Sequence, residues 1–178
     1  MHSNPNLTLM SRDETENAVD QFTVNQKVYD GFMNRLDISA TLQNSKVTSA
    51  LIDESARVYQ WNPEQYEKEK AQKLQDMTKS TEVFLSFFVP ERKEDDLHKK
   101  TTKWKFYLDV GGKRYEGKAS RVKTQFSELM VLYPHHTRWG TPYRITFEVP
   151  VSQVETSQSK MTITGPPGAS NLEFPAVR

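Results

Sequence analysis

The chain has 178 residues, of which 35% are hydrophobic and 26% charged, a composition that fits one domain and excludes two full ones. Its 24 basic and 23 acidic side chains leave a net charge of +1, so no global field attracts nucleic acid or an anionic membrane. The absence of cysteine excludes disulfides, thiolate nucleophiles and thiolate metal sites.

Residues 1–26 are polar and acidic and offer few apolar anchors, which predicts a loosely ordered N-terminal segment. A single domain is expected over residues 27–178. No apolar run approaches the roughly 18 residues that span a bilayer, and the start of the chain lacks the basic and apolar regions of an export signal. The chain as given is therefore expected to be soluble.

The first predicted strand is followed by two predicted helices. Leu36, Ile38, Ala40 and Leu42 alternate with polar residues, as in a half-buried strand. Apolar residues over 47–59 then follow helical spacing. Asn62-Pro63-Glu64 is a good helix start, because Asn caps the exposed amides and Pro suits the first turn. These patterns predict a helical insertion over about 47–79.

The rest of the chain is predicted to consist of strands. Residues 83–89 are rich in aromatic and β-branched side chains, and residues 104–110 alternate strictly between apolar and polar. Gly111-Gly112 predicts a tight hairpin turn, with residues 113–116 returning antiparallel. Further strands are expected over 128–133, 143–149, 160–164 and 171–174. The fold class is therefore mainly β: an antiparallel β-sandwich with a helical insertion after its first strand.

The adjacent histidines His135 and His136, close to Trp139, suggest a possible metal site in the loop 134–139. Successive side chains usually point apart, however, and a metal needs further ligands, so an exposed loop is the favoured interpretation. The sequence also lacks the Gly-x-Ser-x-Gly elbow and a phosphate-binding loop. We therefore expect no catalytic, metal or cofactor-binding residues, and no enzymatic activity.

Basic side chains are concentrated around the predicted hairpin. The possible interaction surface comprises these residues together with the loop: Lys103, Lys105, Tyr107, Lys113, Arg114, Tyr115, His135, His136 and Trp139. Cations beside aromatic rings on a sheet can bind single-stranded nucleic acid, which makes an oligonucleotide-binding β-barrel one alternative. Lysines on sheet edges also prevent aggregation without any ligand, and we favour that interpretation. Exposure of Trp104 or Tyr107 would favour the nucleic-acid alternative.

The succession Trp104-x-Phe106-x-Leu108, Gly111-Gly112, Tyr133-Pro134, Trp139 and Tyr143-x-Ile145-x-Phe147 resembles the immunoglobulin-like sandwich domains of uncharacterised bacterial surface or periplasmic lipoproteins. The resemblance covers the chain from about Glu82 onward. It implies a periplasmic or outer-membrane-anchored protein, held at the membrane only through a lipid anchor. The cysteine that would carry such an anchor is absent from this chain.

The sequence thus predicts a non-enzymatic binding or structural module, exported in a bacterium, whose partner is another macromolecule. A protein or a cell-envelope component is the expected partner, and nucleic acid is disfavoured. The main alternative is a small metal-dependent hydrolase that uses the loop 134–139. That alternative requires His135, His136 and a carboxylate to converge in one pocket.

Overall fold

Eight antiparallel strands form one sheet in the computed structural model, which describes residues 7–178. The strands are β1 (Thr23–Asp30), β2 (Met33–Leu42), β3 (Thr81–Phe88), β4 (Lys105–Val110), β5 (Lys113–Arg121), β6 (Thr141–Phe147), β7 (Ser159–Gly165) and β8 (Gly168–Phe174). Their order across the sheet is β1-β2-β3-β6-β5-β4-β7-β8. The prediction of a mainly β, antiparallel fold is confirmed.

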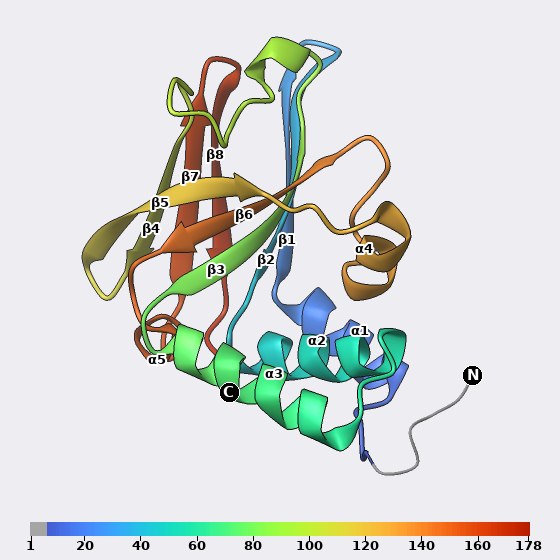
Figure 1. The fold of residues 1–178 in the computed structure, drawn as a ribbon. Coiled ribbons are helices and arrows are strands. Elements are labelled where there is room, and N and C mark those ends of the chain that lie inside the picture. The colour runs from blue at the N-terminus through green and yellow to red at the C-terminus, as the bar shows by residue number, and fades with distance from the viewer. Residues whose placement is uncertain (1–6) are drawn as a thin grey trace.

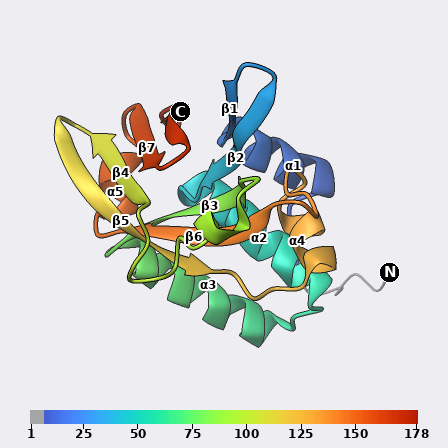
Figure 2. The same cartoon turned by 90° about the horizontal axis from the view of Figure 1, so that it is seen from above.

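The sheet curls until it is nearly a barrel, and β5 makes the corner. Residues 113–116 of β5 pair with β4, whereas residues 117–121 pair with β6. Gly117 stands at this change of partner, where an added Cβ would lie 2.6 Å from the Phe147 ring. The outer strands β1 and β8 come together, so that the strands follow one another round a ring (Figures 1 and 2).

The main hydrophobic core fills the inside of the curled sheet. The predicted alternation in β2 is confirmed, because Leu36, Ile38 and Ala40 are fully buried. Strands β3 to β8 add inward-facing residues of the same kind, and a fully buried Leu, Ile or Phe contributes about 1.5–3 kcal/mol. The Gly111-Gly112 turn is also confirmed: both residues have positive φ, at 57° and 77°.

Helices cover one end and one outer face of the sheet (Figure 1). They are α1 (Arg12–Gln21), α2 (Ser45–Val58), α3 (Pro63–Met77), α4 (Phe126–Leu132) and α5 (Val151–Val154), with a 3-10 turn over Arg92–Glu94. Helices α2 and α3 confirm the predicted helical insertion. No helix within residues 7–178 is long and apolar enough to cross a membrane.

A second hydrophobic cluster joins these helices to the outer face of β3. Val19 of α1, Leu51 of α2 and Leu129 of α4 pack around Phe84, whose side chain points away from the main core. The Phe84 ring stacks on that of Tyr133, with centroids 3.7 Å apart. β3 is therefore covered on both faces, which explains its nearly unbroken apolar sequence.

The N-terminal segment differs from the loose tail expected over residues 1–26. Within the described part of it, α1 is a capped helix whose residues Ala18 and Val19 are buried, and β1 begins at Thr23. The sequence pattern missed β1 because its inward positions hold only Val24 and Val28 as apolar residues. Residues 1–6 lie outside the described part of the chain.

Two buried acidic residues of α2 bind this N-terminal segment to the rest of the fold. The Asp53 carboxylate accepts hydrogen bonds from the Met10 amide at 2.8 Å and from the Tyr66 hydroxyl of α3 at 2.6 Å. Burial and this carboxylate raise the pKa of Tyr66 to about 12. Glu54 forms an ion pair with Arg12 at 3.5 Å. Polar groups that hydrophobicity patterns ignore thus order the start of the chain.

The strand predicted over 128–133 is wrong, because residues 126–132 form α4. An unbroken apolar run is compatible with either structure, and periodicity alone does not separate a short helix from a buried strand. As a helix, the segment buries Leu129 and Tyr133 on one side and exposes Met130 and Val131. The tertiary cluster around Phe84 therefore decides the structure of this segment.

Candidate functional site

The loop between α4 and β6, residues 133–140, carries three residues of the predicted interaction surface. His135 Nε2 lies 2.6 Å from Asp20 Oδ1 of α1. The neighbouring His136 points elsewhere: it is only 2% exposed, and its Nδ1 lies 2.8 Å from Ser86 Oγ of β3. The two imidazoles therefore do not converge, and residues 7–178 hold no group of three or more histidine or acidic side chains suited to a metal ion.

The buried His136 anchors the loop to the sheet. Its ring meets those of Phe84 and Phe126, with centroids 5.7 and 5.8 Å away, and burial lowers its pKa. Gly140 makes room for the bond between Ser86 and His136, because an added Cβ at this position would collide with Ser86 Oγ. The serine and histidine have the spacing of a nucleophile and a base, but both are buried, so a structural role is favoured.

An open groove of about 570 Å³ lies between this loop and the outer face of β1, β2 and β3. Its volume is within the roughly 300–1,000 Å³ typical of ligand sites. Most of the lining residues have polar side chains, and they come from the outward positions of three strands and from the loop: Asn25, Lys27, Asn34, Asp37, Ser39, Ser86, Phe88, His135, Thr137, Trp139 and Gly140. The groove therefore offers many hydrogen-bonding groups to a bound molecule.

Trp139 is the notable apolar group of this groove, because 75% of its surface is exposed. Trp is highly buried on average, and it is enriched at interfaces, where its ring is apolar and its N–H can bond to a partner. Across the groove, Lys27 Nζ and Asp37 Oδ2 form an ion pair of 3.7 Å. Both partners are more than a third exposed, so the pair contributes little to stability and both remain accessible to a ligand.

The basic hairpin of β4 and β5 is partly neutralised by its own acids. Arg114 donates from Nε and Nη2 to the two oxygens of Asp109, at 2.7 and 3.0 Å, and lies 5.0 Å from the centroid of the Tyr107 ring. This guanidinium lowers the pKa of Asp109. Lys105 Nζ lies 3.5 Å from Glu116 Oε1. Arg114 and Lys105 are thus engaged in local pairs on the surface.

The aromatic residues of the hairpin do not share one exposed face. Tyr107 is half-buried on the outer side of β4, between the buried Phe106 and Leu108, whereas Tyr115 packs against the main core. Lys103 and Lys113 are exposed. Trp104 is only 2% exposed; its ring meets Phe87 edge-on at 5.0 Å, and its Nε1 donates to the Glu94 carbonyl at 2.8 Å. Its burial weakens the oligonucleotide-binding alternative.

The turn that joins β4 to β5 lies on the opposite side of the molecule from α4 and the loop that follows it, although the far end of β5 leads toward α4 (Figures 1 and 2). The nine predicted residues therefore do not form one surface. Sequence reasoning missed Asn25, Lys27 and Ser86 of the groove. Ser86 could have been noticed as the single hydroxyl within the apolar run 83–89.

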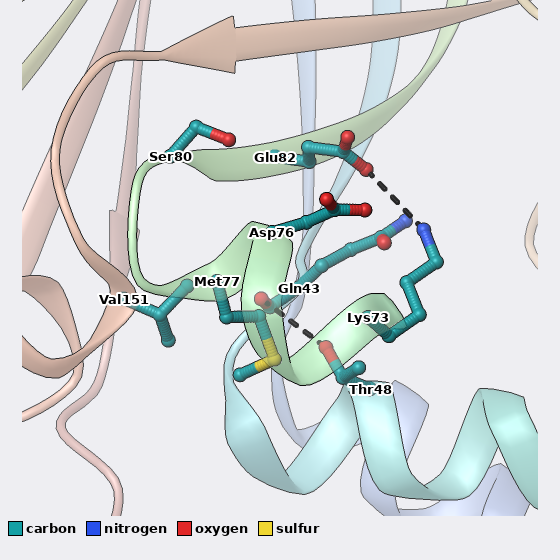
Figure 3. A pocket seen from close by; sticks show the side chains of 8 residues that line it. All are labelled: Gln43, Thr48, Lys73, Asp76, Met77, Ser80, Glu82 and Val151. Carbon is teal, nitrogen blue, oxygen red and sulfur yellow. Dashed lines mark hydrogen bonds and ion pairs between the residues drawn. The ribbon is translucent and has the colours of Figure 1, made fainter. Parts of the chain in front are cut away.

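A separate small cavity opens between α3, the start of β3 and the end of β2. It is lined by Gln43, Thr48, Lys73, Asp76, Met77, Ser80, Glu82 and Val151 (Figure 3). Its volume of about 20 Å³ is enough for one water molecule and too small for an organic ligand.

Comparison with protein-family models, with curated proteins and with solved structures finds no match for this chain. The groove and the other cavities of the fold are therefore the features from which a function can be inferred.

Proposed function

We propose that this protein is a non-enzymatic binding module that holds a polysaccharide chain in the groove between the loop 133–140 and the outer face of β1, β2 and β3. The observation that carries the proposal is the exposed Trp139 beside a row of polar side chains. A cell-envelope polysaccharide is one form of the macromolecular partner that the sequence predicts.

The chemistry of a sugar ring matches the two kinds of group in this groove. One face of a pyranose ring presents C–H groups, which pack on an indole ring, while its hydroxyls both donate and accept hydrogen bonds. Asn25 and Asn34 supply amides, Asp37 a carboxylate and Ser39 a hydroxyl. An open groove also lets a chain continue beyond both ends of the bound segment, which a closed pocket does not.

The proposed function also includes a specific fold type and a place in the cell for this protein. We infer an immunoglobulin-like sandwich of an exported bacterial lipoprotein, in the periplasm or anchored to the outer membrane. Such a location would put the groove among envelope polysaccharides. Cell fractionation followed by immunoblotting tests the location, and recovery of the protein in the cytoplasmic fraction would contradict it.

Binding to purified polysaccharides tests the proposed function. The protein is incubated with insoluble peptidoglycan, chitin and cellulose, and with an array of soluble glycans. We expect Trp139→Ala to weaken binding to the recognised polysaccharide by about tenfold or more, a loss of about 1.4 kcal/mol. Asn25→Ala, which removes an exposed amide of the same groove, should act in the same direction. Thermal unfolding should stay unchanged, because both changes lie on the surface.

Tyr107→Ala provides the matched control, because Tyr107 lies on the hairpin at the opposite side of the molecule. It should bind polysaccharide as the unmodified protein does. Failure to bind any polysaccharide would overturn the proposal. A loss of binding with Tyr107→Ala but not with Trp139→Ala would move the binding surface to the hairpin.

The contact between Ser86 and His136 favours one competing function, a serine hydrolase that acts in the same groove. Incubation with a serine-reactive fluorophosphonate, followed by mass spectrometry, separates the two functions. We expect no labelling, because Ser86 is only 8% exposed and its Oγ is held by the imidazole. Covalent modification of Ser86, abolished in His136→Asn, would establish the hydrolase instead.

A further inference from the structure

A second cavity, of about 160 Å³, lies between the helices and the outer face of the sheet, away from Trp139. Its walls come from α2, α3, α4, β3, β6 and the segment after β5. Its apolar lining includes Leu51, Ile52, Trp61, Phe84, Val122, Leu129 and Leu132. A protein cavity of about 150 Å³ lined by Leu, Ile and Phe is large enough to bind benzene. This cavity therefore has room for one aromatic ring or a short branched chain.

One end of this cavity is polar. The Tyr133 hydroxyl accepts a hydrogen bond from Gln43 Nε2 at 2.5 Å, so its own O–H is available to donate. Burial raises the pKa of Tyr133, which keeps the hydroxyl protonated at neutral pH. A buried O–H donor at the end of an apolar cavity is suited to an acceptor group on a ligand.

Two cations line the same cavity and share one carboxylate. Glu82 Oε2 lies 3.3 Å from Arg144 Nε and 3.8 Å from Lys73 Nζ. Figure 3 shows Lys73 and Glu82 joined beside the side chain of Gln43. Since Arg144 meets Glu82 through Nε, the N–H groups at the ends of its guanidinium can serve a second anion.

Glu69 lines this cavity, whereas Glu82 lines the smaller neighbouring one. Glu69 Oε1 accepts a hydrogen bond from Gln65 Nε2 at 2.8 Å. Lys73 and Arg144 are balanced by Glu69 in the lining and by Glu82, which both cations meet beside the cavity, so any preference for an anion must come from the placement of the donors. The Arg144 guanidinium and the Tyr133 hydroxyl supply such donors, because both residues line the cavity.

We propose that this cavity binds a small monocarboxylate with an apolar body of about one ring, whose carboxylate is held by Arg144 and the Tyr133 hydroxyl. The apolar body lies against Leu51, Phe84 and Leu129. The site is independent of the proposed polysaccharide groove, because Trp139 and the outward residues of β1 and β2 take no part in it.

The test uses benzoate as the probe, with benzamide and toluene as matched molecules of nearly the same size. Binding to the whole protein at about pH 7 is measured by calorimetric titration. We expect benzoate to bind about tenfold more tightly than benzamide or toluene. Arg144→Gln should reduce the affinity for benzoate to that for benzamide. Arg92→Gln, an exposed arginine in the 3-10 turn, is the control and should change nothing.

Two further variants locate the site. Tyr133→Phe keeps the ring stacked on Phe84 and removes only the hydroxyl, so it should lower the affinity for benzoate several-fold. Leu51→Trp should fill the cavity and abolish binding of all three probes, while circular dichroism shows that the variant remains folded. If Leu51→Trp does not fold, chemical-shift changes of the Leu51 and Leu129 methyl groups in the unmodified protein locate the probe instead.

Equal affinities for benzoate and benzamide would overturn the proposal. So would failure of all three probes to bind, or a benzoate affinity that is unchanged in Arg144→Gln and Leu51→Trp. None of these results affects the polysaccharide proposal, whose variant Trp139→Ala should bind benzoate normally.

Discussion

At the scale of single residues, the groove depends on one contact that links a loop to a strand. Ser86 faces outward from β3 and meets the buried His136, and Gly140 leaves the space that this contact needs. Only Ser86 stands out in the sequence, as the single hydroxyl of the apolar run 83–89, and nothing there links it to His136 or Gly140, because the three become neighbours only through the fold. This explains why His136 is interpreted from sequence as an exposed loop residue, whereas the structure makes it a buried anchor.

Gly140→Ala is predicted to lower the free energy of unfolding by about 1–3 kcal/mol, because its Cβ would collide with Ser86 Oγ. The same change in a Ser86→Ala background should cost less, since the colliding oxygen is gone. Urea denaturation of the four proteins in this double-mutant cycle measures the coupling. A cost of Gly140→Ala that is the same in both backgrounds would contradict the prediction.

His136 makes the stability of the protein depend on pH. Burial lowers its pKa in the folded state from the ordinary value of 6.5, so the folded protein binds fewer protons than the unfolded chain just below that pH. The contribution of this residue to stability is present above about pH 6.5 and is lost as the pH falls through the lowered pKa. The free energy of unfolding should therefore fall on acidification from about pH 7 to pH 5.

The variant His136→Asn isolates this effect from the titration of carboxylates. It can keep a hydrogen bond to Ser86, since its amide replaces Nδ1, but it does not titrate in this range. Its stability should fall less steeply between about pH 7 and pH 5 than that of the unmodified protein. The free energies of unfolding of both proteins are measured by urea denaturation at each pH. If they fell equally steeply with pH, His136 would not be the responsible group.

At the scale of elements, the sequence predicts correctly those segments whose own pattern is decisive. Leu36 to Leu42 alternate, Asn62-Pro63 starts a helix, and Gly111-Gly112 makes the hairpin turn. The sequence does not predict correctly those segments whose structure depends on contacts with other elements. The run 128–133 is compatible with strand and helix, and β1 has too few apolar residues to be recognised without its pairing to β2.

Helix α1 forms although its segment is polar and acidic, because a capping motif stabilises its first turn. Ser11 Oγ accepts from the Glu14 amide at 3.2 Å, and Glu14 Oε2 accepts from the Ser11 amide at 2.8 Å. This reciprocal capping lowers the pKa of Glu14, chiefly through the bond from the Ser11 backbone. The motif is readable in the sequence as Ser11-x-x-Glu14, and the acidic character of the segment obscured it.

Ser11→Ala is predicted to destabilise the protein by about 1 kcal/mol, because the Glu14 amide loses its acceptor. The bond from the Ser11 amide to Glu14 survives, so the helix should remain formed. Ser157→Ala, an exposed serine outside any helix, is the control and should change stability by less than about 0.5 kcal/mol. Thermal denaturation of both variants checks this, and equal effects would contradict a capping role.

At the scale of the whole molecule, the two hydrophobic clusters share strand β3. Val83, Leu85 and Phe87 point into the main core, while Phe84 joins the helices on the other face. The helical insertion is therefore packed on the sheet and does not form an independent unit. Both candidate ligand sites follow from this arrangement, because each lies where a helix or loop covers the outer face of β3.

The shared strand predicts that the helices and the sheet unfold together in one transition. Leu51→Ala, in α2, removes a nearly buried side chain from the helical cluster and should cost about 2 kcal/mol, near the low end for such changes because the residue borders a cavity. Far-ultraviolet circular dichroism follows the helices, and near-ultraviolet circular dichroism follows the packed aromatic rings of the core. In urea, both signals should shift to the same lower midpoint in the variant, because loosening the helices also uncovers Phe84 and one face of β3. If the far-ultraviolet signal shifted alone, the helical layer would be a separate folding unit.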